Sequence, residues 1–445
     1  MFSNLFFSTA IVDSFVALLF FALLLWGRKN QFCEKGAFND DFTNIEVMKS
    51  LRGFAALGIV IGHAYEIFLG YGGFNFYPLG AVVDHSALEP AFQYKGFFSL
   101  FPITATYCVS IFMFCSGFGL VKSLNTKKDY FKGFVKNRIG RALVIPFYVD
   151  ALIYGLYMLL TNMPLKNEQW VCNLLGITLM DQYAWFPIVL TILYILFYLC
   201  FRYIKKRSTC YAIILVVMIA LGVGFCFNGH YVWWVGPENW WVEKETAMAA
   251  KWWQWDAVRW FCGEWWVNTM PAFFTGIVFS TYEEKIVAFF KKSYAKRFCA
   301  LLVITAALFT LSEFTFEKFG YWSEFQMNGP EIMDKLITYF TQIPVMALFP
   351  ITVFIFMMKF RTINPVTRFY GKYAFYTYLM NLMAIELFRF MEYREYCPVN
   401  FGIFAPLVYL TCVVAASSIL AVGEQKIVSV FQNLIFKKKE VRTPV

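Results

Sequence analysis

The sequence has few charged residues and very few histidines. Only 15% of its 445 residues are charged, against about 25% in ordinary soluble domains. The three histidines give little support to a histidine-based metal site, so we predict no metal. The 11 cysteines contain no Cys-x-x-Cys pair, and several fall in apolar runs, where cysteine behaves as a small buried hydrophobe.

Apolar residues are abundant instead. They make up 59% of the chain, aromatic residues make up 21%, and the mean hydropathy is +0.55. A soluble fold cannot hide that much apolar surface, and a disordered chain has the opposite composition. The composition therefore predicts an all-α, polytopic membrane helix bundle with many aromatic anchors at the membrane interfaces.

Eleven apolar segments predict about eleven transmembrane helices in a single membrane domain spanning 1–445. Within it, 1–49 would be an extra N-terminal helix and loop, 50–423 the core and 424–445 a basic tail. The first segment is not a cleavable signal, because no basic residue precedes it and Arg28 and Lys29 follow it. The eleven segments are 8–27, 50–70, 97–121, 142–162, 184–201, 210–227, 265–281, 298–316, 337–358, 373–391 and 402–423.

The basic residues are distributed unevenly between alternate loops. One set of loops holds 29 Lys and Arg residues and the other set holds 8. By the positive-inside rule, the N-terminus is predicted outside and the C-terminus inside. The net charge of +10 is then a sign of orientation in a lipid membrane, and we predict no nucleic-acid partner.

Ionisable residues inside predicted spans are candidates for function, because each costs about 2.5–3.5 kcal/mol at a helix centre. Few occur, and no soluble domain is predicted that could carry the chemistry instead. They are Asp13, Arg52, His63, Glu66, Asp150, Glu313, Glu386 and Arg389. Glu386 and Arg389 are most simply an internal ion pair.

His63 is the only histidine in a predicted span. Arg52 precedes it by eleven residues, so on a helix the two lie about 20° apart on one face and roughly 16 Å apart along the axis. Glu66 follows at i+3, within reach of the imidazole. A neutral histidine held by a carboxylate is a good general base, although a packed histidine bonded to a neighbouring carbonyl fits the same pattern.

Arg138 and Arg141 begin a predicted helix after a lysine-rich loop. Their i, i+3 spacing places both guanidinium groups on one α-helical face, where they could grip a phosphorylated ligand. Binding of lipid phosphate explains the same spacing equally well.

Ten of the 14 Trp residues lie in 233–266, in a predicted outer loop. An interfacial belt is the simplest interpretation. Carboxylates interleave the rings, so a surface that stacks sugar rings is an alternative.

Four short motifs, in order along 50–400, together resemble acyltransferase family 3 of integral-membrane O-acyltransferases, in its stand-alone form. One departure is Tyr378-Leu-Met-Asn381, where the family commonly has Tyr-Leu-x-His. The four motifs are Arg52-Gly53 with His63, Phe112-Met-Phe-Cys-Ser116-Gly117-Phe118, Arg138-Ile-Gly-Arg141 before Pro146, and Trp185-Phe186.

The resemblance implies transfer of an acyl group, most simply acetyl, from cytosolic acyl-CoA to a hydroxyl group. The acceptor would be a cell-surface glycan or a lipid-linked sugar, and the location a bacterial inner or plasma membrane. Arg138 and Arg141 would hold the CoA phosphates, with Arg52 at the mouth. Ser116 would line the pocket near the thioester. His63 would deprotonate the acceptor or carry the acyl group, with Glu66 orienting it.

Two alternatives remain open. A non-enzymatic carrier or flippase of a lipid-linked sugar would use the same charges and the same tryptophans without CoA. A membrane-bound O-acyltransferase of the unrelated Asn/His type would also place a histidine in a long apolar run, although the Arg-x10-His and Arg-x-x-Arg motifs argue against it.

Overall fold

A computed structural model describes residues 32–65, 100–160, 167–177, 179–228, 260–262, 265–320, 332–393 and 405–436 of the chain. This part is helical, and its one β-type pairing is an isolated bridge between Phe32 and Phe360. The longer helices are α2 (Ile45–Tyr65), α4 (Leu100–Thr126), α5 (Ile145–Leu160), α7 (Trp185–Tyr203), α8 (Arg207–Asn228), α10 (Trp265–Thr281), α12 (Tyr294–Lys318), α13 (Ile332–Phe356), α14 (Pro365–Tyr393) and α15 (Ala405–Phe436).

The all-α prediction is confirmed for the described residues, and these ten helices coincide with ten of the predicted segments. The remaining segment, 8–27, lies outside the described residues. Seven described helices are long and apolar enough to cross a membrane. They are 105–126, 135–160, 185–203, 207–227, 294–316, 332–356 and 409–436.

The other three helices at predicted spans are shorter or more polar. Helix α10 has only 17 residues, α2 includes Lys49, Arg52 and His63, and α14 begins with two basic residues in its first turns. The chain is thus a multi-pass membrane protein, while the number of eleven spans and the orientation of the termini stay predictions.

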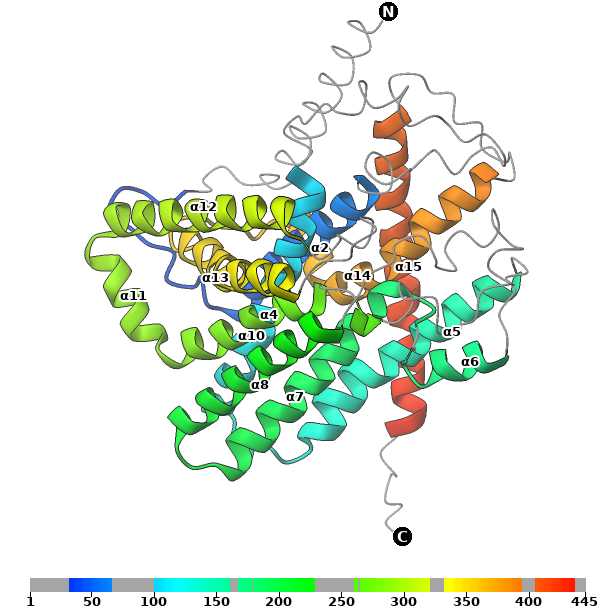
Figure 1. Cartoon of the computed structure of the whole chain (residues 1–445), viewed down its shortest axis with the longest axis horizontal. Helices are drawn as coiled ribbons and strands as arrows, with labels where there is room; N and C mark the ends of the chain where they lie inside the picture. Colours follow the sequence, from blue (N-terminus) through cyan, green and yellow to red (C-terminus); the bar gives the residue numbers. More distant parts are fainter. Residues whose placement is uncertain are drawn as a thin grey trace, which may run out of the picture.

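Five helices form the centre of the bundle: α4 packs against α2 and α10, and α14 packs against α2 and α15 (Figure 1). Glycine permits the closest crossings. A Cβ atom at Gly53 of α2 would collide with the backbone of Gly371 in α14, and one at Gly117 of α4 would collide with the backbone of Phe273 in α10. Two of the short motifs therefore contain the residue that lets two central helices touch.

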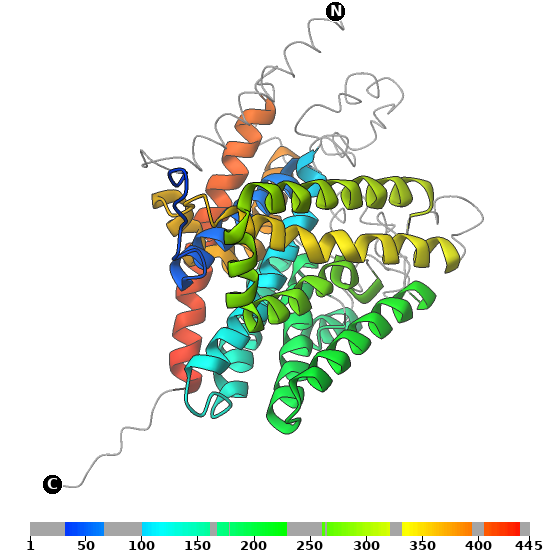
Figure 2. The ribbon, with the colours of Figure 1, turned by 90° about the vertical axis from the view of Figure 1, so that its left-hand side faces the viewer.

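The outer helices surround this centre. Helices α12 and α13 pack together on one side, while α7 and α8 form another side (Figures 1 and 2). Their outward faces carry large exposed apolar side chains, such as Leu199, Val216 and Val303. An apolar exterior of this kind is suited to lipid.

Shorter helices were not predicted by the sequence. A π-helix, η4 (Val135–Val144), leads directly into α5, and α11 (Glu283–Lys292) connects α10 to α12. Two more, α6 (Asn167–Leu174) and the 3₁₀ turn η5 (Gln182–Ala184), lie between α5 and α7, and a further 3₁₀ turn is η9 (Trp260–Cys262).

Candidate functional site

His63 lies near the end of α2, where its side chain is buried between α14 and η5. Its Nδ1 atom is 2.9 Å from Oδ1 of Asn381, a residue of α14 that is 318 positions away in the sequence. The asparagine is fully buried. The bundle therefore brings His63, the only histidine among the described residues, to the position where the sequence departs from the family pattern.

The hydrogen bonds of Asn381 determine which nitrogen of His63 carries the proton. The amide Nδ2 of Asn381 donates to the backbone carbonyl of Tyr378. A carbonyl only accepts, so the amide oxygen must face His63 and accept from Nδ1–H. In the neutral ring the lone pair is then on Nε2, which makes no hydrogen bond to any other described residue. Nε2 is the atom that can accept a proton.

Tyr183 packs flat against the other side of the histidine. The two ring centroids are 4.0 Å apart and the ring planes differ by 11°. Asp181 caps the turn that carries this tyrosine, because its Oδ1 accepts from the backbone N–H of Tyr183 at 2.9 Å. Stacking on Tyr183 thus fixes the plane of the imidazole ring, and the hydrogen bond to Asn381 fixes the rotation of the ring within that plane.

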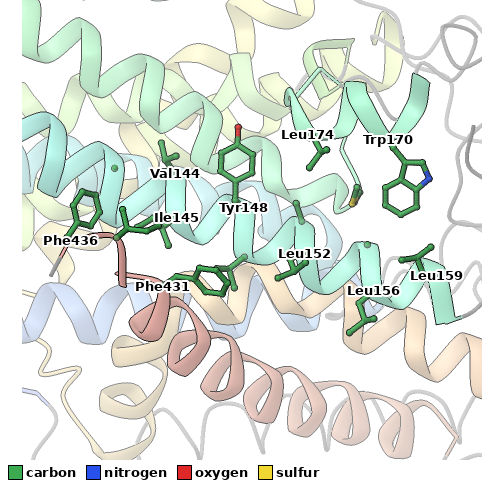
Figure 3. A pocket seen from close by; sticks show the side chains of 16 residues that line it. Val144, Ile145, Tyr148, Leu152, Leu156, Leu159, Trp170, Leu174, Phe431 and Phe436 are labelled. Carbon is green, nitrogen blue, oxygen red and sulfur yellow. The ribbon is translucent and has the colours of Figure 1, made fainter. Parts of the chain in front are cut away.

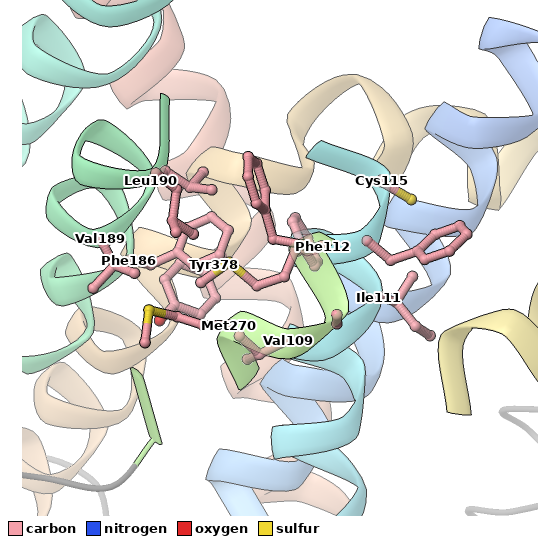
Figure 4. Packing of buried hydrophobic residues seen from close by; sticks show 14 of the residues in the cluster. Val109, Ile111, Phe112, Cys115, Phe186, Val189, Leu190, Met270 and Tyr378 are labelled. Carbon is pink, nitrogen blue, oxygen red and sulfur yellow. The ribbon is translucent and has the colours of Figure 1, made fainter. Parts of the chain in front are cut away.

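Tyr378 contacts Tyr183 and joins the site to the apolar core. Its ring centroid is 6.2 Å from that of Tyr183 and 5.1 Å from that of Phe186, and Phe186 makes an edge contact with Phe112 of α4. Figure 4 shows Phe112, Phe186 and Tyr378 meeting where three helices converge. The Trp185-Phe186 motif therefore builds a wall of the site.

Three buried carboxyl groups lie close together, and two of them, Asp150 and Asp181, lie near Tyr378. Asp150 of α5, Asp181 and Glu424 of α15 are almost wholly inaccessible to solvent and influence one another electrostatically. Both carboxyl oxygens of Asp150 and of Glu424 lack a hydrogen-bond partner among the described residues. No group of three or more His, Cys, Asp or Glu side chains in the described ranges is arranged to hold a metal ion.

The sequence had pointed to only one of these three acids. Asp150 lies in a predicted span, whereas Asp181 falls in a predicted outer loop. Glu424 is one residue beyond the last predicted span, but α15 continues to Phe436 and keeps it within the helix. Because the sequence after 423 is more polar and basic, it was predicted as a tail and not as part of the helix.

Arg52 and Ser116 lie on the facing helices α2 and α4. The Arg52 guanidinium is within electrostatic reach of the Cys115 thiol, and its Nε is buried without a partner among the described residues. The hydroxyl of Ser116 donates to the carbonyl of Phe112 at 2.8 Å, within its own helix. The neighbour of Arg52 in α4 is thus Cys115, while the hydroxyl proton of Ser116 is engaged within its own helix.

Arg138 and Arg141 contact different elements. The Nη2 atom of Arg138 donates to Oγ of Ser123 in α4 at 3.0 Å, whereas Nη2 of Arg141 is 3.4 Å from the carbonyl of Phe436 in α15. The expected shared face assumed an α-helix. The π-helix η4 has wider turns, so residues three apart are rotated differently.

Tyr130 is the aromatic neighbour of Arg138. Burial raises the pKa of Tyr130 to about 12, although the nearby Arg138 charge opposes the shift. The phenol therefore stays protonated at neutral pH. A neutral O–H donor beside a guanidinium is favourable for an anionic ligand.

Several other residues predicted to contribute lie outside the described residues, and others form hydrogen bonds within the bundle. Glu66, Asp13 and most of the tryptophan-rich segment are outside them, as are the side chains of Glu386 and Arg389. Of the described tryptophans, Trp260 donates to the Gly176 carbonyl at 2.9 Å. Glu313 accepts from Tyr107 at 3.3 Å.

These features define a class: a multi-pass helix bundle with a buried, oriented histidine at its centre. A family model described as an acyltransferase domain, that of acyltransferase family 3, matches residues 46–422. The chain belongs to acyltransferase family 3 and is a membrane acyltransferase. No curated protein matched the chain, and no solved structure matched it.

The family assignment confirms the resemblance carried by the four motifs. It also favours an enzyme over the non-enzymatic carrier, and this family over the unrelated Asn/His type of O-acyltransferase. It covers the core from α2 to the middle of α15, which includes His63, Asn381 and Tyr183.

Proposed function

We propose that the protein transfers an acyl group, in the first place acetyl, from acyl-CoA to a hydroxyl of a cell-surface glycan or lipid-linked sugar. The observation that carries this proposal is the contact between His63 and Asn381, because it leaves the Nε2 lone pair available as a base. A bacterial inner or plasma membrane is the proposed location.

In the proposed reaction, Nε2 of His63 takes the proton of the acceptor hydroxyl as its oxygen attacks the thioester carbonyl. The carbon–sulfur bond then breaks, and the imidazolium returns its proton to the departing CoA thiolate. Base and acid are the same residue, so the ring ends as it began. The stacking on Tyr183 holds the ring in one orientation through both steps.

The donor would bind from the basic end of the bundle. Arg138, beside Tyr130, is the proposed contact for CoA phosphates, and the buried Nε of Arg52 is the proposed contact further inward. Ser116 would border the thioester. We leave Arg141 out of this group, because its guanidinium is directed to α15 and not to α4.

The proposed acceptor is a sugar hydroxyl. Support comes from the sequence of 233–266, where tryptophans alternate with carboxylates as in surfaces that stack sugar rings and bind their hydroxyls. Glu66 follows His63 at i+3 in the sequence and is the proposed second orienting group.

Acyl-CoA dependence is tested directly with the purified full-length protein. Acetyl-CoA is added with a polyprenyl-linked or soluble glycan acceptor, and free CoA thiol and acetylated acceptor are measured together. We expect both products in equal amounts, with little thiol release when the acceptor is omitted. Unchanged acetyl-CoA in the presence of a range of glycan acceptors would contradict the donor assignment.

A further inference from the structure

A long apolar groove runs along the outside of α5. It has a volume of about 570 Å³ and is bounded by η4 and α5, by α6, and by the end of α15. Figure 3 shows Phe436 facing Ile145 at one end, and Leu159 and Trp170 at the other. His63, Asn381 and Tyr183 are not among the residues that line it, so the groove is separate from the proposed active site.

The length of the groove suits a single lipid chain. From Ile145 to Leu159 the helix rises about 21 Å, compared with about 30 Å for the whole hydrocarbon core. The lining side chains Leu152 and Leu156 project into it and are more than half exposed. A chain lying there would cover apolar surface that is otherwise open.

One end of the groove is cationic. The Arg141 guanidinium carbon lies 4.8 Å from the centre of the Phe436 ring, and Nζ of Lys136 lies 5.1 Å from the same ring. Neither side chain forms an ion pair within the described part of the chain. The Nε atom of Arg141 is buried and has no hydrogen-bond partner there.

These charges indicate the chemistry of the occupant. An apolar channel that ends at two unpaired cations and a buried, unpartnered N–H matches a molecule with a long hydrocarbon chain and an anionic head. CoA fits less well along the channel, because its pantetheine arm carries amides that the apolar lining does not satisfy. Three lysines, Lys437–Lys439, follow Phe436 directly in the sequence and add to the positive charge of this segment.

We propose that the groove between α5, α6 and α15 is a binding site for one anionic phospholipid, with its phosphate at Lys136 and Arg141 and one acyl chain along α5. This assigns the second arginine of the Arg138-Ile-Gly-Arg141 motif to lipid and not to the acyl donor. It is independent of the proposed transfer reaction.

The test uses purified full-length protein incubated with equal amounts of phosphatidylglycerol and phosphatidylcholine, followed by native mass spectrometry. We expect one phosphatidylglycerol to be retained at least tenfold over phosphatidylcholine. Each cation near an anionic headgroup contributes about fivefold. Lys136→Ala should therefore reduce retention about fivefold, and Lys136→Ala with Arg141→Ala roughly thirtyfold.

A second pair of variants tests the channel itself. Leu156→Trp fills the groove and should abolish retention of the lipid, whereas Val303→Trp changes another exposed apolar residue, in α12, and should leave it unchanged. Equal retention of both lipids, or retention unaffected by Lys136→Ala and Leu156→Trp in folded protein, would overturn the proposal. Displacement of the lipid by millimolar CoA would also overturn it, since the cations would then serve the donor.

Discussion

Oδ1 of Asn381 accepts from Nδ1 of His63 at 2.9 Å, while the amide nitrogen of the same asparagine is held by the Tyr378 carbonyl. A neutral amide therefore orients the histidine where a carboxylate often does so. An amide fixes the tautomer but adds no negative charge to stabilise an imidazolium. The asparagine at the family's Tyr-Leu-x-His position is thus an orienting group of the proposed base.

Loss of that amide should disturb the base without removing it. Asn381→Ala frees Nδ1, so either nitrogen can carry the proton and the ring can rotate. We expect kcat for transfer to fall about 10- to 100-fold, less than the loss of about 10²–10⁴-fold expected when the general base itself is removed, with little change in KM for acyl-CoA. Asn381→Asp keeps an acceptor on Nδ1 and should retain more activity, with an altered pH profile. Equal losses in both variants would indicate a purely structural role.

Gly53 should be intolerant of a side chain. A Cβ there would collide with the backbone of Gly371, and backbone cannot move aside as a side chain can. We expect Gly53→Ala to destabilise the bundle by about 1–3 kcal/mol, as overpacking does, measured as a lower thermal midpoint in detergent.

Gly119 of α4 is the matched control, since a Cβ at that position meets nothing within 4 Å. Gly119→Ala should be neutral or stabilise the helix by up to about 1 kcal/mol. Similar midpoints for the two variants would show that the α2 and α14 backbones are not in close contact.

Substitution of Arg138 and of Arg141 should have different effects on the affinity for acyl-CoA. A hydrogen bond to a charged group contributes about 1.5–3 kcal/mol, so Arg138→Ala should weaken acyl-CoA binding roughly tenfold or more. Arg141→Ala should leave acyl-CoA affinity close to that of the unchanged protein. Calorimetric titration with CoA distinguishes the two. A larger loss for Arg141→Ala than for Arg138→Ala would restore the alternative in which both hold the donor.

The charge distribution predicts the orientation of the loops. A cysteine at 250 should react with a membrane-impermeant thiol reagent added outside intact cells, and a cysteine at 128 should not. The background for both should lack all native cysteines; among the described residues, the thiols of Cys299 and Cys412 are exposed. Protection at 250 with labelling at 128 would invert the topology and move the tryptophan-rich segment to the donor side.

Much of the fold could be predicted from the sequence because lipid requires continuous apolar helices. The ends were harder to place. The prediction ended the last span at 423 because polar residues such as Glu424 and Gln425 follow. The helix α15 nevertheless continues through them to Phe436. The π-helix at 135–144 has no simple sequence signature, so the separation of Arg138 from Arg141 could not be foreseen.

The candidate site was only partly predictable for a different reason. His63 was found because a histidine in a span is costly and rare. Its partners come from distant segments: Asn381 looks like one polar residue in an apolar helix, and Tyr183 and Asp181 lie in what resembles a plain loop. Only tertiary packing brings them together, so the sequence could suggest the local carboxylate Glu66 but not these distant partners.

The most direct test of the proposed chemistry is the rate of acetyl transfer by His63→Gln. Glutamine keeps a hydrogen bond toward Asn381 but has no basic nitrogen, so it removes basicity while preserving packing. Transfer by the folded variant should fall 10²–10⁴-fold, about the contribution of a general base, while CoA binding is unchanged. Transfer close to that of the unchanged protein would contradict the assignment of His63 as the base.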